Sequence, residues 1–138
     1  MKKSVYGRSG GFTLIELLVV LVILGLIAGL VVPNIVGQTE KARARAAKAS
    51  IQQLSNAIDT YYLDTGQLPD RLENLVNEPA SAENWNGPYA KQSTLNDPWN
   101  QPWEYRVPGE HGAYDLVSLG ADGAPGGEGN SADIKSWE

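Results

Sequence analysis

The sequence predicts an α+β protein in which one long N-terminal helix precedes a small domain with short antiparallel strands. Three observations carry this prediction: an apolar run near the N-terminus, a one-sided apolar stripe after it, and alternating apolar and polar residues towards the C-terminus. The 138 residues suit one modest domain, and the chain has no cysteine to form a disulfide. The fold must therefore be held by its core, by neighbouring molecules or by an ion.

The apolar run covers residues 12–36. It is interrupted at only four positions, which are Thr13, Glu16, Pro33 and Asn34. A helix of this length measures about 37 Å, which is enough to cross a membrane. The run is too long for a cleaved secretory signal, and no small-residue cleavage site follows it. Three basic residues and no acidic residue precede it, so we expect the first ten residues on the cytoplasmic side: Lys2, Lys3 and Arg8.

A second helical pattern follows, and it has only one apolar face. Its apolar residues are spaced by four, three, four and three positions, which places them along one stripe: Ala47, Ile51, Leu54, Ile58 and Tyr61. Strong helix formers fill residues 40–49, so we expect one unbroken helix from residue 12 to about residue 63. Gly66 is suited to follow its end, and Pro69 cannot prolong it.

The remaining chain predicts less regular structure. Residues 70–76 predict a short second helix with Asp70 as its N-cap, and residues 79–102 read as mostly loop. Residues 103–107 alternate as a half-buried strand does, and residues 114–119 form the returning strand after a turn. We expect the tail around residues 133–137 to pack back onto the domain.

The side chains of the C-terminal half that could take part in catalysis or binding are few. Five aromatic residues among the prolines are interpreted as core filling rather than as a sugar site: Trp85, Tyr89, Trp99, Trp103 and Tyr105. His111 lies in the predicted turn without a partner nearby in the sequence, so we expect it to be solvated. A lone histidine cannot build a catalytic zinc site, and the sequence offers no nucleophile–base pair, so no enzyme is expected. Residues 49–138 carry four basic and fourteen acidic side chains, which argues against nucleic acid as a partner.

Glu16 is the only ionisable residue in the apolar run. A carboxylate at membrane depth costs about 3 kcal/mol, so a partner is expected for it. In one interpretation, Glu16 lies near the helix end and reaches the lipid headgroups. In the other, cleavage between Gly11 and Phe12 creates an α-ammonium one helical turn away. A neighbouring copy displaced by about four residues, roughly 6 Å, would then bring its ammonium beside this carboxylate.

Two glycines and a proline lie further along the run. Gly25 and Gly29 have the spacing that lets helices approach each other closely. Pro33 cannot donate a hydrogen bond to the carbonyl of Gly29, so this turn is the weakest of the helix. It is either a simple kink in a membrane anchor or a turn that melts on assembly.

A glycine-rich acidic stretch, residues 119–133, contains Asp122 and ends with Asp133. Carboxylates and backbone carbonyls are the oxygen ligands that Ca²⁺ prefers, and glycines let a loop turn its carbonyls inward. The regular spacing of an EF-hand is missing. A calcium loop and a flexible acidic loop are both compatible with this spacing.

Residues 10–16, Gly-Gly-Phe-Thr-Leu-Ile-Glu, with the long apolar run after them, resemble the class III signal of type IV pilin-like proteins. The resemblance implies cleavage after Gly11 by a prepilin peptidase, N-methylation of Phe12, and a long helix packed on a small antiparallel β-sheet. It further implies that Glu16 assists self-assembly and that the chain unwinds locally near Pro33 in the filament.

Residues 118–137, with Asp97-Pro98-Trp99 upstream and no cysteine pair, resemble the major pseudopilins of type II secretion systems, the general secretion pathway protein G family. This resemblance implies that the C-terminal loop binds Ca²⁺. The matching ligands are two side chains and two backbone carbonyls, those of Asp122 and Asp133 and those of Leu119 and Asn130. Some relatives have an aspartate where Ala132 stands here, so Glu128, Ser131 or water would complete the ligand set.

Together the resemblances imply a structural subunit in the inner membrane of a Gram-negative bacterium. It would consist of a cleaved leader (1–11), a transmembrane and filament-core helix (12–36) and a periplasmic domain (37–138). Copies would polymerise into a helical pseudopilus that drives export of folded proteins across the outer membrane. The implied partners are other copies, minor pseudopilins, the assembly platform, the prepilin peptidase/N-methyltransferase and membrane lipid. Two alternatives remain open: a type IV pilus major subunit, and a membrane-anchored calcium-binding module that does not polymerise.

Overall fold

The structure, a computed structural model, describes residues 10–138 except for the side chains of residues 31–36. The chain divides into two compact units, residues 1–36 and 37–138, which are described separately. One long helix is followed by short elements: α1 (Leu14–Thr65), η1 (Leu72–Leu75), η2 (Gln92–Leu95), β1 (Glu104–Arg106), β2 (Asp115–Ser118), η3 (Gly129–Ser131) and β3 (Ile134–Lys135). The three η elements are 3₁₀ helices.

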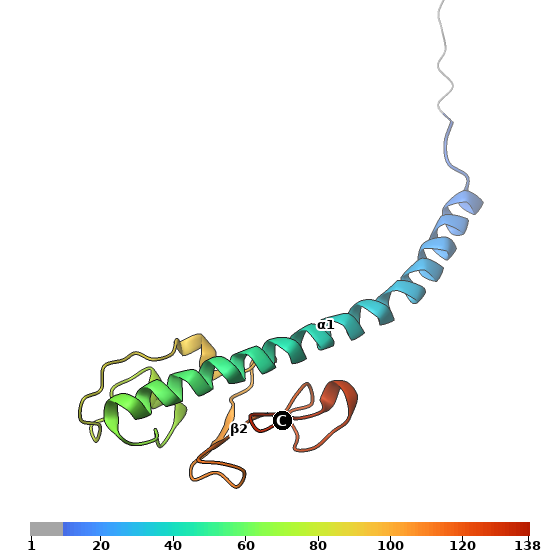
Figure 1. Ribbon diagram of the computed structural model, residues 1–138. Coiled ribbons are helices and arrows are strands. Elements are labelled where there is room, and N and C mark those ends of the chain that lie inside the picture. Colours follow the sequence, from blue (N-terminus) through green and yellow to red (C-terminus); the bar gives the residue numbers. More distant parts are fainter. Residues whose placement is uncertain (1–9) are drawn as a thin grey trace, which may run out of the picture. The chain divides into compact units, whose positions relative to one another are not determined.

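The long helix α1 is a single element of 52 residues, as the sequence predicts (Figure 1). Its ends lie within about two residues of the predicted ones, which is the usual uncertainty of helix boundaries. Gly66 follows the last helical residue with a φ of +74°, and its N–H donates to the carbonyl of Tyr62 at 2.8 Å. This is the left-handed termination that favours glycine, and Gly66 is confirmed in that role.

The predicted membrane span falls partly outside the described residues. Among the residues whose structure is described, no helix is both long enough and apolar enough to cross a membrane. The predicted span of residues 12–36 includes residues 31–36, whose side chains are not described. The backbone is helical there, and the predicted melting of the turn at Pro33 stays a prediction. The basic residues of the leader, within residues 1–9, also lie outside the described chain.

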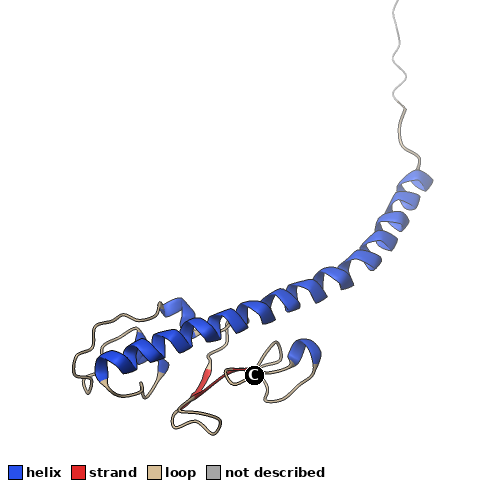
Figure 2. Ribbon diagram, in the orientation of Figure 1, coloured by secondary structure: helices blue, strands red, loops and turns tan. Residues whose placement is uncertain are grey.

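The sheet has three antiparallel strands in the order β1-β2-β3. Strand, drawn in red in Figure 2, makes up only a small part of the chain. Tyr105 of β1 pairs with Leu116 of β2, and Ser118 of β2 pairs with Ile134 of β3. Both predicted strands are therefore confirmed, each shorter than expected. The tail also packs back as predicted, because the N–H of Ser136 donates to the carbonyl of Leu116 at 2.9 Å.

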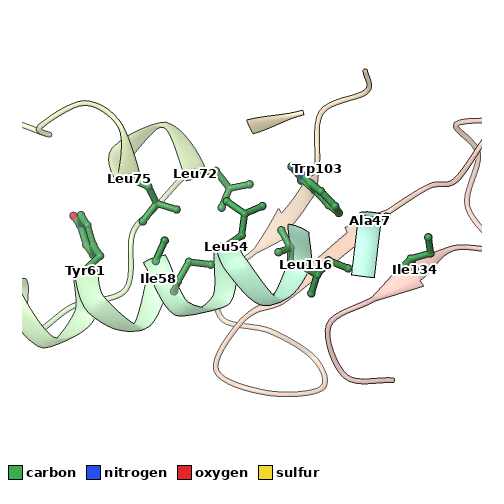
Figure 3. Packing of buried hydrophobic residues seen from close by; sticks show 11 residues of the cluster. Ala47, Leu54, Ile58, Tyr61, Leu72, Leu75, Trp103, Leu116 and Ile134 are labelled. Carbon is green, nitrogen blue, oxygen red and sulfur yellow. The ribbon is translucent and has the colours of Figure 1, made fainter. Parts of the chain in front are cut away.

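The core lies between one face of α1 and the segments that follow it (Figure 3). All five stripe residues of α1 are at most 7% exposed, so the predicted stripe is confirmed. They pack with buried residues of η1, of β2, of β3 and of the chain just before β1: Leu72, Leu75, Leu116, Ile134 and Trp103. Burying each such side chain contributes about 1.5–3 kcal/mol, so this cluster is the main stabilisation of residues 37–138.

The aromatic residues predicted to fill the core do so. Trp103 is buried in the cluster, and the other four pack against it while partly buried. Their polar atoms reach backbone carbonyls or carboxylates; for example, Trp103 Nε1 donates to the carbonyl of Thr94 at 3.0 Å, and the Tyr105 hydroxyl donates to that of Pro69 at 2.9 Å. Aromatic side chains with satisfied polar ends thus connect loops that have few ladder hydrogen bonds.

Two predictions in this half of the chain are wrong. The second helix is shorter than predicted and is a 3₁₀ turn, Leu72–Leu75, whose N-cap residue is Arg71. Asp70 is therefore not the N-cap, since Arg71 is still extended, with a φ of −150°. The turn is tight because Leu72 and Leu75, three positions apart, both point into the core.

His111 is exposed to solvent as expected, but the expectation that it has no partner nearby in the sequence is wrong. Its Nδ1 lies 3.2 Å from Asp115 Oδ2, and its ring stacks on Trp137 with centroids 3.9 Å apart. The reason is that the turn before β2 returns the chain on itself and the C-terminal tail folds over the same place. About half of the imidazole side chain stays exposed.

Candidate functional site

Two regions hold the predicted functional residues, one in each unit of the chain. The first is the start of α1. Phe12 is 92% exposed, and a Cβ placed on Gly10 or Gly11 would meet no atom within 4 Å. The predicted cleavage point between Gly11 and Phe12 is therefore not covered by any described part of the chain.

Glu16 takes part in a capping box at the first turn of α1. Its Oε2 accepts hydrogen bonds from the backbone N–H of Thr13 at 2.8 Å and from the Thr13 hydroxyl at 3.1 Å. In return, the Glu16 N–H donates to Thr13 Oγ1 at 3.3 Å. Glutamate three positions after a threonine is the sequence signature of this motif, so the spacing Thr13-x-x-Glu16 could have revealed it.

The capping box leaves part of the carboxylate available. Within the described chain, Oε1 of Glu16 accepts no hydrogen bond, whereas Oε2 is bound by Thr13. The carboxylate borders an open groove that is otherwise apolar and is lined by Phe12, Ile15, Val19 and Val20. A cationic group of another molecule can therefore reach Oε1 without breaking the helix cap.

The second region is the C-terminal loop, residues 119–133. The structure places Leu119 directly after β2, Asp122 in the exposed part of the loop, Asn130 in η3, and Asp133 directly before β3. Gly127 allows two parts of the loop, at residues 127 and 131, to approach each other closely. A Cβ on Gly127 would lie 2.2 Å from the carbonyl oxygen of Ser131, and its φ is +80°.

Only one of the two carboxylate oxygens of Asp133 accepts a hydrogen bond within the described chain. Its Oδ2 accepts the N–H of Gly126 at 2.8 Å, whereas Oδ1 is buried and has no hydrogen-bond partner in the described chain. A buried carboxylate oxygen without a partner loses its hydration without compensation. Asp122, in contrast, is exposed, and its Oδ1 accepts the N–H of Ala124 at 3.2 Å.

The side chains alone do not form a dense metal cluster. No group of three or more histidine, aspartate or glutamate side chains is placed to hold a metal ion among residues 10–30 and 37–138. The donors that the sequence predicts are of a different kind, since two of the four are backbone carbonyls. A cation here would need those carbonyls and water in addition to the two carboxylates.

Two family profiles match the chain, and together they cover most of it. A family profile described as "Type II secretion system (T2SS), protein G" matches residues 34–137, and one described as "Prokaryotic N-terminal methylation motif" matches residues 7–32.

The chain is also similar to whole proteins. It is 46% identical to the type II secretion system core protein G of Xanthomonas campestris pv. campestris, with 91% of this chain and 87% of that protein covered. Identity to the protein of the same name from Vibrio cholerae is 46%, with 94% and 92% covered. The corresponding protein of Pseudomonas aeruginosa is 42% identical, with 95% and 96% covered.

The fold matches a solved structure. The crystal structure of the major pseudopilin from the type 2 secretion system of enterohaemorrhagic Escherichia coli superposes with a TM-score of 0.62 at 29% identity. The match covers 78% of this chain and 96% of that one. The sequence match, the methylation motif and the shared fold lead to one conclusion: this chain belongs to the type II secretion system protein G family.

Proposed function

We propose that the chain is the major structural subunit of a type II secretion pseudopilus. It is made with its N-terminus in the cytoplasm, a single span in the inner membrane and residues 37–138 in the periplasm. A prepilin peptidase removes residues 1–11 and methylates the new amino group of Phe12. Copies then polymerise helically on an inner-membrane platform, together with minor pseudopilins, and the growing filament exports folded proteins. No step in this role is enzymatic.

The observation that carries this proposal is the surface of α1 between Leu14 and Leu30. Its large apolar side chains are 47–83% exposed, whereas the stripe in the second half of the same helix is buried. Contiguous apolar surface of this extent indicates contact with a membrane or with other proteins. Lipid covers it in the precursor, and the same helices of neighbouring copies cover it in the filament.

Glu16 would set the register between copies. After cleavage, the ammonium group at Phe12 of one copy pairs with the free Oε1 of Glu16 in the next. An ion pair is worth far more at low dielectric than in water, and an unpaired carboxylate is costly there. Stacking in the correct register is then the arrangement that satisfies both charges.

The test of this proposal is the mass of the mature protein. The chain is purified from inner membranes of a strain that carries the prepilin peptidase, and its intact mass is measured. We expect a chain that starts at Phe12 and carries one methyl group. A working protein that retained residues 1–11 would contradict the proposal, because the ammonium group at Phe12 could not exist.

We also propose that the C-terminal loop binds Ca²⁺, through the side chains of Asp122 and Asp133 and the carbonyls of Leu119 and Asn130. The buried, unpartnered Oδ1 of Asp133 supports this, since a cation would supply the interaction that it lacks. Glu128, Ser131 or water would complete the ligand set. The ion performs no reaction. It neutralises two carboxylates and joins the two limbs of the loop.

Calcium binding can be measured on the full chain in detergent, because all four tryptophans lie in residues 85–137 and report on that unit. We expect the melting temperature by tryptophan fluorescence to rise on adding Ca²⁺ to chelated protein, and to rise less with Mg²⁺. Asp122→Ala should keep the chelated melting temperature, whereas Asp59→Ala, at an exposed aspartate of α1, should respond as the unaltered chain does. An unaltered chain that melts alike in chelator and Ca²⁺ contradicts the calcium proposal.

A further inference from the structure

Asp97 is a buried carboxylate whose hydrogen bonds join two distant parts of the chain. It is 6% exposed, and Ser118, its partner at the end of β2, is 0% exposed. Asp97 Oδ1 accepts the backbone N–H groups of Trp99 and Gln101, both at 2.9 Å. Asp97 Oδ2 accepts the hydroxyl of Ser118 at 2.5 Å. Both carboxylate oxygens therefore have partners, as a buried charge requires.

Ser118 continues this connection to the start of the C-terminal loop. Its hydroxyl oxygen accepts the N–H of Gly120 at 3.3 Å. The carbonyl of Gly120 in turn accepts a long hydrogen bond, 3.4 Å, from the side-chain amide of Gln101. The residues on either side of Leu119 are thus held by one turn, residues 97–101, which is about twenty positions away in the sequence.

The same turn also contacts the loop beyond its first residue. A Cβ on Gly123 would lie 2.5 Å from Oε1 of Gln101, so the glutamine side chain packs directly against the loop backbone. Gly120 itself has a φ of +67°, and a Cβ there would lie 2.9 Å from the carbonyl oxygen of Ala132. The turn at residues 97–101 therefore holds the loop at the point where its start, at Gly120, lies close to its end, at Ala132.

We propose that Asp97 is a positioning residue for the calcium loop: through Ser118 it fixes the backbone at Leu119, so that the Leu119 carbonyl is held ready to bind the ion. This inference rests on the calcium proposal above. The hydrogen-bonded series Gly120, Ser118, Asp97 is called the Asp97–Ser118 link below. Asp97 does not touch the ion in this arrangement. It acts through the peptide groups that flank a ligand.

The expected size of the effect follows from how metal sites depend on the groups behind their ligands. Removing such a supporting partner typically weakens metal binding about 10–100-fold. A carbonyl that is free to move must also be ordered when the ion binds, and this ordering opposes binding. Breaking the link should therefore raise the calcium dissociation constant, and it should also lower the stability of the calcium-free domain, because Asp97 Oδ2 is then buried without a partner.

The test compares two serines, Ser118 and Ser136. Each hydroxyl oxygen accepts a backbone N–H group, that of Gly120 just after β2 and that of Leu116 within β2, respectively. Ser118→Ala removes the link. Ser136→Ala is the matched control, because the Ser136 hydroxyl oxygen accepts the N–H of Leu116 at 3.1 Å, away from Asp97. The calcium dissociation constant is measured by calorimetry on full-length protein in detergent, and tryptophan fluorescence in chelator verifies that each variant is folded. We expect about a tenfold or greater increase for Ser118→Ala and less than about a twofold change for Ser136→Ala.

Asp97→Asn provides a second variant of the same link. Asparagine keeps one oxygen for the backbone N–H groups of the turn but presents an amide to Ser118, so weaker calcium binding is again expected. Unchanged calcium affinity in Ser118→Ala, beside clear binding by the unaltered chain, overturns the inference alone. Equal weakening by Ser118→Ala and Ser136→Ala also overturns it, because the loss would then reflect general destabilisation. An unaltered chain that binds no calcium removes the calcium proposal and this inference with it.

Discussion

The two halves of α1 use apolar side chains in opposite ways. Between Leu14 and Leu30 these side chains lie all around the helix and are exposed, whereas from Ala47 to Tyr61 they form one stripe that the domain buries. Both halves are equally helical. The difference teaches that helix formation and burial are separate properties here. The second half is buried by the domain, whereas the first half is not buried by any described part of the chain, and we propose that lipid and other copies cover it.

The largest expected effect concerns the half that depends on other molecules. Glu16→Gln should insert and be cleaved normally yet form few or no filaments, because glutamine preserves the capping box but removes the charge. Filaments are counted by electron microscopy, with cleavage followed by mass spectrometry. Glu16→Ala, which removes the charge and the glutamate half of the capping box, should assemble no better. Normal filaments from Glu16→Gln would show that the charge does not set the register.

The next effect contrasts one leucine from each half. Leu54→Ala should lower the free energy of unfolding of residues 37–138 by about 2–5 kcal/mol, because Leu54 is 1% exposed and its removal leaves a cavity. Leu24→Ala should change it by less than about 0.5 kcal/mol, since Leu24 is 56% exposed. Denaturant titration followed by tryptophan fluorescence measures both. Similar losses of unfolding free energy in the two variants would contradict the distinction between the two halves of α1.

A smaller effect is expected at the first turn of α1. Thr13→Val removes the hydroxyl of the capping box but leaves the charge of Glu16, so the helix start should lose about 0.5–2 kcal/mol. Amide hydrogen exchange of residues 14–17 in detergent should become faster, while filaments still form. Thr60→Val is the matched control, because the Thr60 hydroxyl donates within the helix to the Asn56 carbonyl and is far from the cap. Lost assembly in Thr13→Val would mean that the cap itself is needed for stacking.

The smallest effect is a pH dependence confined to the domain. Burial raises the pKa of Asp115, but hydrogen bonds from the Glu110 backbone and from the His111 side chain and backbone outweigh it, so the pKa lies below its ordinary value. A lowered pKa in the folded state stabilises the fold above about pH 4, and this contribution is lost as the pH falls through the folded-state pKa. Melting temperatures between pH 6 and pH 3 should fall more steeply for the unaltered chain than for Asp115→Asn. Parallel curves would contradict this role.

Local patterns in the sequence predicted much of the fold, because each depends on residues close together. The length of α1, its buried stripe, its end before Gly66 and two of the strands are of this kind. The stacking of His111 on Trp137 could not be predicted, since Trp137 reaches it only after the tail folds back, whereas Asp115, only four positions away, could have been considered as a partner. The N-cap at Asp70 was wrong because core packing of Leu72 and Leu75 decided where the turn begins.

The two candidate sites also differ in how much of each could be predicted from the sequence. Gly11, Phe12 and Glu16 lie within six consecutive residues, so the sequence displays them directly, and the spacing of Thr13 and Glu16 could have revealed the capping box. The support beneath the C-terminal loop is not visible in the sequence, because Asp97 and Ser118 are 21 positions apart and no periodic pattern connects them. Asp97-Pro98-Trp99 could be noted as a motif, but its contact with β2 appears only in the folded chain.

The small size of the sheet has a mechanical consequence. With strands of three, four and two residues, few ladder hydrogen bonds hold the C-terminal half together. Hydrogen bonds of tryptophan, tyrosine and acidic side chains hold it together instead. For example, Trp99 Nε1 donates to Glu40 Oε2 at 2.7 Å. These hydrogen bonds fasten the segment of residues 85–99 directly to α1, through Tyr89 to Asp64 and Trp99 to Glu40, so separating this segment from the helix requires breaking side-chain contacts and not a sheet edge.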